Sequence, residues 1–472
     1  MMMEHTGYRV LKQIFLACVL VAMLLIFYSG GYWLTASVLL FGLAAAAAVR
    51  IPEKRFAIAL CIVTFAVRLL LIVLLPTQPA SDFALQYQAA QQFASHDFSY
   101  LENPYFQTWG YQVGLVIYEG LLLRLWNNII IIKMVNALFA TGTVYLIYRI
   151  ARHLTADIPA RIAAVCYSVL LFPALYVTVL NNSLQSGFFT LAAIALWLRA
   201  EERQNKTIQY IGIGLCCTAA AFFRPGTIVL LLAMAATALF GCIRRANRRT
   251  TARALYQLAI VFVVYFVSFR MISYATEALG YTQDGLTNGN PLWQFVVGTD
   301  TAHNGGWSAE ASEHINTLMQ EQGISRDEAE LQITREQLSV PKRHLMELAT
   351  FKIKTFWTET TLGWSLKGCD VSETAKNRLT EVAKTQQYLL LLATLLGAVA
   401  FFAKRQKDSA WILPFFLMAT FCAYVVIEVQ PRYSYTVQLV MAVLSASCIA
   451  WIWRGVCSVR QRIAAPDETK LS

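Results

Sequence analysis

Long apolar runs separated by short polar turns occupy most of this 472-residue chain. A hydrocarbon core of about 30 Å requires roughly 20 apolar residues in each spanning helix. The pattern therefore predicts an all-α polytopic membrane protein with about 12 transmembrane helices. The predicted spans are Val10–Tyr28, Tyr32–Val49, Phe56–Leu75, Ile129–Tyr148, Pro159–Leu180, Leu184–Leu198, Ile208–Phe223, Thr227–Phe240, Leu255–Tyr274, Tyr388–Phe402, Ala410–Ile427 and Ser434–Trp453.

Two longer polar stretches interrupt these spans. In the first, helical spacing from Phe83 to Phe93 predicts a helix with Asp82 in N-cap position. In the second, helical patterns run from Ser308 to Leu338 and from Pro341 to Trp357. We therefore divide the chain into two accessory N-terminal spans (1–55), a membrane core (56–279) with a catalytic outer loop (77–128), an extracytoplasmic loop region (280–387), and three C-terminal spans with a cytoplasmic tail (388–472).

The segment Tyr111–Asn127 decides the predicted topology. It is apolar, but it is short and carries Glu119 and Arg124. If it spanned the membrane, every later loop would change sides. We expect instead an amphipathic helix lying along the outer interface, because all the basic clusters then fall on one side of the membrane.

Charge supports a membrane protein rather than a nucleic-acid-binding one. The chain is 57% hydrophobic and only 14% charged, with a net charge of +11, whereas soluble domains are roughly one-quarter charged. Basic clusters in alternate loops follow the positive-inside pattern, which predicts a multi-pass plasma-membrane protein with both termini cytoplasmic and the polar loops extracytoplasmic. Nine of the ten cysteines lie in predicted spans or on the inner side, so no disulfide framework is indicated.

Amide and aromatic side chains are dense just after the third span. Aromatic faces stack on the C–H bonds of a sugar ring, and amides bind its hydroxyl groups. Asp82 opens this stretch, and two interpretations stand: it only caps the following helix, or it is catalytic. The sugar-binding candidates are Gln86, Tyr87, Tyr105, Trp109 and Gln112, and Asp97 and Glu102 are supporting acidic candidates.

Three arginines are candidates for holding a phosphate group, which a guanidinium matches bidentately. Arg432 follows a proline and lies between Glu428, a supporting candidate, and Tyr433, a second phosphate-binding candidate. Arg224 lies at a predicted outer turn, although many such side chains only snorkel. Arg68 lies in mid-helix, where a charge costs about 2.5–3.5 kcal/mol unless it faces protein or water. A structural ion pair and a lipid phosphate both explain it.

These features resemble the integral-membrane glycosyltransferases of the GT-C superfamily. The resemblance is to the polyprenyl-phosphate-sugar-dependent group that includes protein O-mannosyltransferases (glycosyltransferase family 39) and the lipid A aminoarabinose transferase. Each matching motif is short, and their order along the chain carries the likeness. The motifs are Ser81-Asp82 with Tyr87, Pro104-Tyr105-Phe106, Tyr111-Gln112, Asn136-Ala137-Leu138-Phe139, Tyr148-Arg149-Ile150-Ala151, Arg224-Pro225, Gly305-Gly306-Trp307, Lys354 with Trp357, and Gln430-Pro431-Arg432-Tyr433.

The resemblance implies that Asp82 occupies the position of the catalytic carboxylate. It implies a polyprenyl-phosphate sugar as co-substrate and a glycan, lipid or protein as acceptor. Together with the residues, it suggests inverting transfer, with Asp82 as general base and the phosphate held by Arg432, aided by Arg224 or Arg68. Some members carry an Asp-Glu or Asp-x-Asp pair where this chain has a lone Asp, so a divalent cation stays an open alternative. We find no metal-ligand spacing and no nucleotide-binding glycine loop.

Two other classes of function remain as alternatives. One is a lipid-linked glycan flippase or secondary transporter, which would place charged groups near mid-membrane in repeated halves. No internal repeat is evident, and the polar groups gather at predicted outer turns. The other is a non-catalytic subunit of an envelope-assembly complex, from which loss of activity on changing Asp82 alone would distinguish an enzyme.

Overall fold

The computed structural model describes residues 32–200, 207–245, 247–404 and 406–464. Every regular element in these ranges is a helix, which confirms the predicted all-α class. The predicted first span, Val10–Tyr28, lies outside the described residues. The α-helices are α2 (Tyr32–Arg50), α3 (Glu53–Leu74), α4 (Asp82–Ala94), α5 (Pro104–Thr108), α6 (Val113–Leu125), α7 (Ile129–Leu154), α8 (Asp157–Ser168), α9 (Leu171–Leu175), α10 (Ser183–Ala200), α11 (Thr207–Phe223), α12 (Thr227–Arg245), α13 (Arg248–Ala278), α14 (Trp293–Thr299), α15 (Ala309–Gln322), α16 (Arg326–Leu338), α17 (Lys342–Thr358), α18 (Glu373–Ala403), α19 (Ile412–Val426) and α20 (Tyr435–Ala464).

Short 3₁₀ turns join several of these helices. They are η1 (Ser99–Glu102), η2 (Gly110–Gln112), η3 (Tyr176–Thr178), η4 (Asp408–Trp411) and η5 (Pro431–Ser434).

Eight helices of the described ranges are long and apolar enough to cross a membrane: α2, α3, α7, α12, α13, α18, and α19 and α20 with the 3₁₀ turns before them. The segment from Asp157 to Thr178 would be a ninth if its two bent halves form one span. Of the other predicted spans, α11 has 17 residues and α10 is buried along most of its length. The expected number of twelve stays a prediction.

The broken span holds Arg68. Its two halves, α8 and the α9–η3 segment, are bent by 62°, and Pro173 accounts for the break because it lacks an N–H and crowds the preceding turn. The carbonyl of Ser168 at the break accepts a 2.8 Å hydrogen bond from Arg68, which is only 1% exposed. A helix end leaves such carbonyls without partners, and here the buried guanidinium satisfies one.

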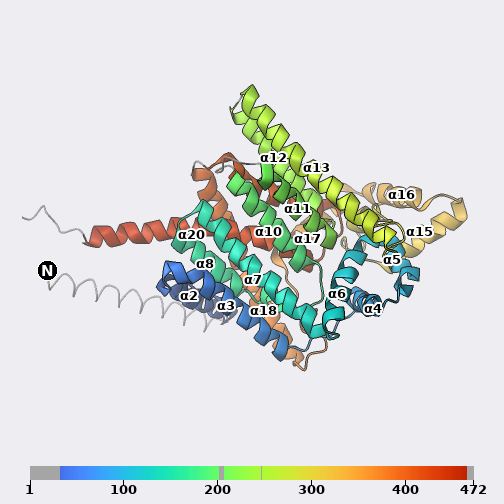
Figure 1. Cartoon of the computed structure of the whole chain (residues 1–472), viewed down its shortest axis with the longest axis horizontal. Helices are drawn as coiled ribbons and strands as arrows, with labels where there is room; N and C mark the ends of the chain where they lie inside the picture. Colours follow the sequence, from blue (N-terminus) through green and yellow to red (C-terminus); the bar gives the residue numbers. More distant parts are fainter. Residues whose placement is uncertain (1–31, 201–206, 246, 405, 465–472) are drawn as a thin grey trace, which may run out of the picture.

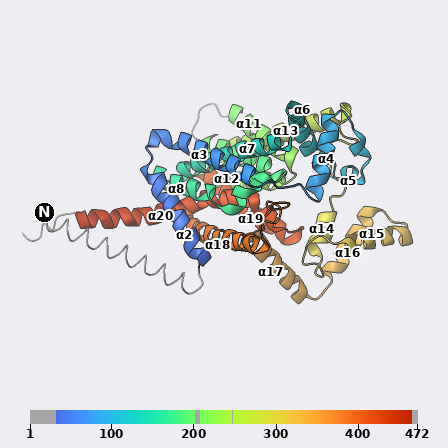
Figure 2. The same ribbon diagram turned by 90° about the horizontal axis from the view of Figure 1, so that it is seen from below.

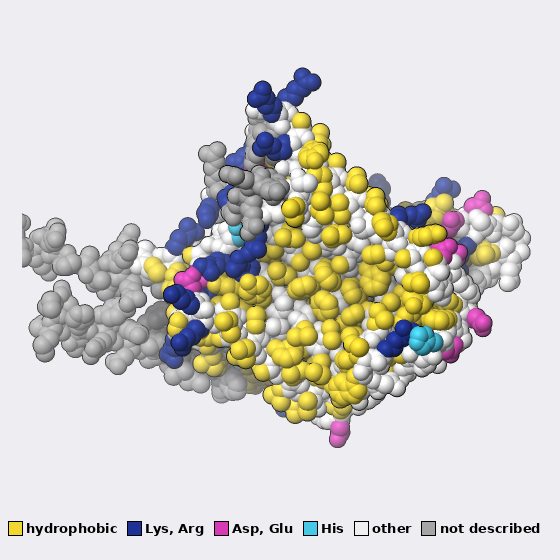
Figure 3. Space-filling model, viewed as in Figure 1, with side chains coloured by type: hydrophobic (Ala, Val, Ile, Leu, Met, Phe, Trp, Pro, Cys, Tyr) yellow, Lys and Arg dark blue, Asp and Glu magenta, His cyan; other side chains and the backbone are white. Residues whose placement is uncertain are grey.

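The bundle has two unlike ends. Helix α7 packs against α3, α8, α10 and α20 and runs between the ends. We call the end covered by α4–α6 and α14–α17 the cap end, at the right of Figure 1. Figure 2 shows α4–α5 and α14–α16 as separate groups at this end. Lys and Arg side chains gather toward the opposite end, at the left and top of Figure 3, which we call the basic end.

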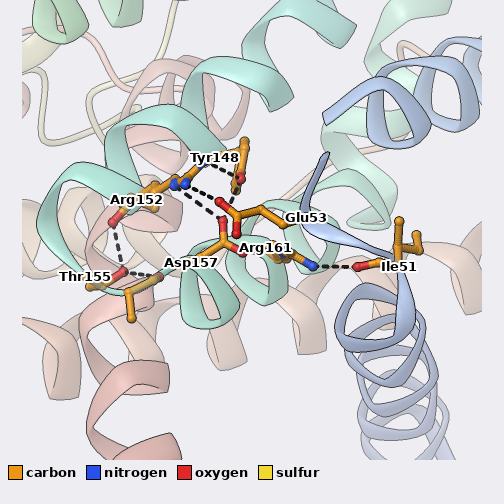
Figure 4. A network of polar contacts seen from close by, with 9 residues as sticks. Ile51, Glu53, Tyr148, Arg152, Thr155, Asp157 and Arg161 are labelled. Atoms are coloured by element: carbon orange, nitrogen blue, oxygen red, sulfur yellow. Dashed lines mark hydrogen bonds and ion pairs between the residues drawn. The ribbon is translucent and has the colours of Figure 1, made fainter. Parts of the chain in front are cut away.

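Ion pairs fasten the helices together at the basic end (Figure 4). Arg152 in α7 pairs with Glu53 at the start of α3 and, at 3.4 Å, with Asp157 in α8. Arg161 pairs with Asp157 and donates a 2.7 Å hydrogen bond to the carbonyl of Ile51. The network therefore joins α3, α7 and α8 near the turn that precedes α3 and the turn between α7 and α8.

Helix α6 bears on one detail of the expected topology. Its 13 residues reach about 20 Å at 1.5 Å per residue, too short to cross the membrane. Its expected place along the outer interface stays a prediction, but the helix is largely enclosed by protein. It packs closely on α4, with Gly120 against the ring of Phe93, and it encloses Glu119, which is 1% exposed.

The loop region beyond α13 forms a small unit at the cap end. Helices α14, α15 and α16 share an apolar core that includes Trp293, Val296 and Ile315. The predicted helical stretch from Ser308 to Leu338 is divided at Gly323, whose φ of +64° ends α15 in a left-handed cap that glycine adopts without steric cost. A backbone hydrogen bond from Glu428 to Gln294 joins this unit to the last turn of the bundle.

Candidate functional site

Asp82 lies where the chain leaves α3 and turns into α4 at the cap end. The connecting segment is held by two distant elements: the carbonyl of Thr77 accepts a 2.7 Å hydrogen bond from Lys133 of α7, and the N–H of Gln78 bonds to the carbonyl of Lys367 at 2.9 Å. These contacts fix the start of α4, so the position of Asp82 depends on the membrane core and on the later loop region.

The structure corrects the expected capping role of Asp82. Asp82 is the first residue of α4, Ser81 is the N-cap, and no side chain makes a capping hydrogen bond. The carboxylate is exposed and, within the described ranges, accepts a hydrogen bond only from the hydroxyl of Ser81, at 3.4 Å. A cap therefore does not explain this aspartate, although the positive end of the helix dipole favours its charge.

The backbone before Asp82 is strained. Ser81 has φ +52° and ψ −135°, a combination that costs a residue with a side chain roughly 1–3 kcal/mol. Strain of this kind persists only where the surroundings impose it, and here the anchored segment on one side and α4 on the other do so. The direction in which Asp82 leaves the helix is therefore set by the fold.

Arg432 is surrounded by aromatic rings beside α4. Its guanidinium carbon lies 5.1 Å from the ring of Phe83, 5.0 Å from that of Trp364 and 5.6 Å from that of Tyr433. In the described part of the chain it makes no hydrogen bond or ion pair with a carboxylate, and its Nε is buried without a partner. Stacking holds such a cation in place but leaves its N–H donors free.

A second guanidinium shares the ring of Tyr433. Arg224, in the turn between α11 and α12, lies 4.8 Å from this ring and donates hydrogen bonds to Ser183 at 3.1 Å and Asn182 at 3.4 Å. Asn182 in turn donates to Gln112 at 3.3 Å. Two positive charges on one ring repel each other, and an anion between them would remove that cost.

Two tyrosines connect the carboxylate with the arginines. Burial raises the pKa of Tyr105 well above its usual range, the charge of Asp82 raises it further, and Arg432 lowers it. Burial also raises the pKa of Tyr111, while Arg224 lowers it and Glu428 and Asp82 raise it. Such charge effects require proximity, so Asp82, Arg432 and Arg224 lie around the same pair of phenols.

Glu428 and Lys352 complete the charges of this surface. Glu428 is 6% exposed and accepts a 2.6 Å hydrogen bond from Gln430. Lys352 of α17 is also buried and donates a 2.7 Å hydrogen bond to the carbonyl of Gly298. Burial lowers the pKa of Lys352 to about 8, and the nearby charge of Glu428 raises it. With Arg224, Arg432 and Asp82, the group holds more basic than acidic side chains, so it favours an anionic ligand.

Several predicted site residues lie elsewhere. Tyr87 faces Glu119 in the contact between α4 and α6. Asp97 and Glu102 are exposed beyond the far end of α4, about 20 Å along the helix from Asp82, and Asp97 accepts a hydrogen bond from the N–H of Ser99. Arg68 is bound to the helix break deep in the bundle. These four positions lie apart from the charged group around Arg432, and their expected roles stay predictions.

The other predicted residues lie in or beside the charged group. Gln86 donates a 2.9 Å hydrogen bond to the hydroxyl of Tyr105, and Gln112 reaches Arg224 through Asn182. Trp109 contacts the ring of Tyr111 edge-on at 6.3 Å. Sequence reasoning missed Trp364, which lies more than 280 residues from Asp82 in a loop whose pattern carries no signal for it. Tyr111 enters the sequence prediction only as part of a motif.

The described residues around Asp82 do not fit a metal site. No group of three or more His, Cys, Asp or Glu side chains in the described ranges could hold a metal ion. Hard divalent cations take several oxygen ligands, whereas Asp82 offers a single carboxylate.

The fold and part of the sequence match known glycosyltransferases. Residues 120–271, about a third of the chain, match the family model of dolichyl-phosphate-mannose-protein mannosyltransferases. This matched part covers α7–α12 and most of α13, and it contains Arg224 but neither Asp82 nor Arg432. Among curated proteins, none matches the sequence.

Solved structures of an archaeal oligosaccharyltransferase share the fold. The Archaeoglobus fulgidus enzyme AglB, in complex with an inhibitory peptide and a dolichol-phosphate, aligns with a TM-score of 0.52 at 12% identity over 89% of this chain. An Archaeoglobus fulgidus oligosaccharyltransferase tethered to an acceptor peptide gives 0.51 at 12% identity over 86% of this chain, and its apo form gives 0.50 at 13% over 87%. This chain covers 53%, 51% and 52% of those three chains, about half their length.

These findings confirm the resemblance to the GT-C superfamily. The family matched and the fold are those of GT-C glycosyltransferases, multi-pass membrane proteins that act in glycosylation.

Proposed function

We propose that this protein transfers a sugar from a polyprenyl-phosphate-linked donor to an acceptor hydroxyl on the extracytoplasmic face of the membrane. The observation that carries this proposal is the guanidinium of Arg432, which has no acidic partner in the described chain and lies beside α4, whose first residue is Asp82. A carboxylate near an unneutralised arginine provides a base and an anion site within one group of residues.

Related proteins support the choice of donor. The matched family is defined by dolichyl-phosphate-mannose, and the structural relative AglB was solved with a dolichol-phosphate. A lipid-linked donor also suits a chain without a nucleotide-binding glycine loop, because nucleotide sugars are absent outside the cell.

The proposed step is a single displacement. Asp82 accepts the proton of the acceptor hydroxyl, and the acceptor oxygen forms a bond to the anomeric carbon. The bond between that carbon and the phosphate oxygen breaks, and its electron pair leaves with the polyprenyl phosphate. Attack from the face opposite the leaving group inverts the anomeric centre, by the same geometry as in inverting glycosidases.

Arginines aimed at the departing phosphate stabilise the charge that develops there. Arg432 is the main candidate, because stacking on three rings holds it while its N–H groups stay available. Arg224 shares the ring of Tyr433 and would contact the same phosphate. The sugar would be bound by side chains in or beside this charged group: Gln86, Tyr105, Trp109 and Gln112. Glu428 would orient the arginines.

Release of the lipid phosphate tests the proposal. Purified protein in detergent is incubated with polyprenyl-phosphate mannose carrying a radioactive sugar, and free polyprenyl phosphate and sugar are measured. Because the sugar is not identified, polyprenyl-phosphate aminoarabinose is tested in parallel. Mass spectrometry of envelope glycans and lipids from cells with and without the gene then identifies the acceptor. Unchanged donors together with an identical envelope would overturn the proposal.

A further inference from the structure

The basic end of the bundle contains a hollow of about 360 Å³ between α7 and α10. Three arginines and a histidine line it, together with three apolar side chains. The lining residues are Arg149, Ile150, Arg152, His153, Ala195, Leu198 and Arg199. It lies at the end of α7 opposite the one that carries Lys133 and its contact with Thr77, so it is separate from the surface around Asp82.

The arginines of this hollow are unequally neutralised. Arg152 pairs with Glu53 and Asp157. Arg149 lies 6.0 Å from the ring of Tyr145 and, in the described ranges, forms no ion pair with a carboxylate. Arg199, exposed in the last turn of α10, likewise has none there. The hollow therefore holds two arginines that the described chain leaves without a counter-charge.

Membrane topology alone explains basic residues at this end but not their convergence. The positive-inside pattern requires positive charge near the helix ends, and the negative ends of the α7 and α10 dipoles favour it in the last turns. Neither effect requires arginines from two helices to face one hollow. Exposed arginines elsewhere at this end, such as Arg248 and Arg253 on α13, do not line it.

We propose that this hollow binds the phosphate headgroup of an anionic phospholipid from the adjoining leaflet. Arg149 and Arg199 would hold the phosphate by charge-assisted hydrogen bonds, as basic pockets between transmembrane helices do for anionic lipids. Ile150, Ala195 and Leu198 provide an apolar side for the start of the acyl chains. The volume fits one headgroup, since small-ligand sites begin near 300 Å³.

Lipid-dependent thermal stability tests the proposal. The full chain is purified in detergent, and its unfolding temperature is followed during titration with phosphatidylglycerol or with zwitterionic phosphatidylcholine. Phosphatidylglycerol should raise the unfolding temperature and phosphatidylcholine should not. Native mass spectrometry, run in parallel, should detect one retained anionic lipid.

The variant Arg149→Gln/Arg199→Gln should bind phosphatidylglycerol about 25-fold more weakly, from a factor of roughly five for each arginine near a lipid phosphate. The double variant Arg149→Lys/Arg199→Lys keeps both charges and should retain most of the binding, which shows that the loss follows the charge at these two positions. The control Arg248→Gln/Arg253→Gln removes two arginines of the same end outside the hollow and should bind like the wild type.

Three outcomes would overturn the proposal. The first is an equal response of the wild type and the Arg149→Gln/Arg199→Gln variant. The second is an equal loss in the Arg248→Gln/Arg253→Gln control, which would assign binding to net charge. The third is equal protection by inorganic phosphate at the same phosphate concentration, which would assign the hollow to a soluble anion.

Discussion

The arginines of the basic-end network and Arg432 at the cap end are treated in opposite ways. In the basic-end network, Arg152 and Arg161 pair with Glu53 and Asp157, and these contacts fasten α3, α7 and α8 together (Figure 4). At the cap end, Arg432 is stacked on aromatic rings and has no carboxylate partner in the described chain. The first arrangement already satisfies its charges, whereas the second still lacks an anion.

This difference distinguishes arginines that stabilise the fold from arginines that are available to bind a ligand. Leaving a partly buried guanidinium without a counter-charge costs free energy that the fold alone does not recover. A site that binds a phosphate recovers it only when the ligand is present. An arginine held by rings and without a carboxylate is therefore a better indicator of a ligand site in this chain than the number of nearby basic residues.

The largest expected effect is at the carboxylate of the cap end. Asp82→Asn should lower the rate of sugar transfer by about 10²–10⁴, the usual contribution of a general base. Folding should be retained, because Asp82 is exposed and caps nothing. Turnover of the purified variant with polyprenyl-phosphate mannose, or with whichever donor the wild type uses, measures the loss.

Asp97→Asn is the matched control for this change. It removes the same charge beyond the other end of α4 and should leave transfer intact. Normal turnover by Asp82→Asn, or an equal loss in both variants, would show that Asp82 is not the general base. The cap end would then no longer stand as the functional end in the comparison.

The second effect concerns the unneutralised arginine. Arg432→Gln should raise the KM for the lipid donor by roughly 10–100-fold, because hydrogen bonds to charged groups contribute about 1.5–3 kcal/mol. Arg432→Lys should recover only part of this loss, since lysine keeps the charge but not the planar, bidentate and stacking geometry. Steady-state kinetics over a range of donor concentrations separates KM from kcat.

The corresponding control is an arginine that already forms an ion pair with a carboxylate of the protein. Arg244 forms a 2.9 Å ion pair with Asp408 at the basic end, so Arg244→Gln should leave the donor KM unchanged. An unaltered KM in Arg432→Gln would show that stacking, rather than phosphate binding, accounts for this arginine.

Much of the fold follows from the sequence because spanning helices are specified by length and apolarity. Segments such as Phe56–Leu75 and Ile129–Tyr148 coincide closely with α3 and α7. The helix predicted from Phe83 to Phe93 differs from α4 by one residue at each end. These elements depend on local pattern, and local pattern is what a sequence displays.

The site was only partly predictable because it depends on which face of a helix meets which neighbour. Gln86 and Tyr87 are adjacent in sequence, yet one turns to Tyr105 and the other to Glu119. Trp364 reaches Arg432 from a distant loop. The partner of Arg68 is a carbonyl freed by a helix break, which neither predicted explanation, an ion pair or a lipid phosphate, included.

A third, smaller effect tests the structural half of the comparison. Asp157→Asn removes the anion of Arg161, which is 5% exposed, and should lower the free energy of unfolding by about 2 kcal/mol. Transfer per folded molecule should not change, because the network lies at the far end of the bundle. Thermal unfolding in detergent, together with transfer rates, measures both quantities.

Glu53→Gln is the comparison variant for this loss of stability. Its pair with Arg152 is largely exposed, and exposed pairs contribute about 0–1 kcal/mol. If Asp157→Asn changed donor kinetics rather than stability, the paired arginines would also be functional and the contrast between the two ends would fail.

The smallest expected effect concerns Glu119, a buried carboxyl that is neutral when protonated. Glu119 is enclosed between α4 and α6, and neither of its oxygens has a hydrogen-bond partner among the described residues. Burial raises its pKa to about 8 from an ordinary 4.5. Between these values the folded state keeps the proton that the unfolded chain releases. The stability from this group is thus fully present below pH 4.5 and is lost as the pH rises through 8.

Glu119→Gln replaces the protonated carboxyl with a neutral group of the same shape, so it should flatten the fall in unfolding temperature between pH 4.5 and 8. The exposed Glu102→Gln should leave that slope as it is in the wild type. This result bears on the comparison with Arg432. A buried carboxyl without a counter-charge can become neutral by binding a proton. Arg432 stays charged at any physiological pH and therefore requires an anion. A slope that persists in Glu119→Gln would mean that this carboxyl is not the group that titrates.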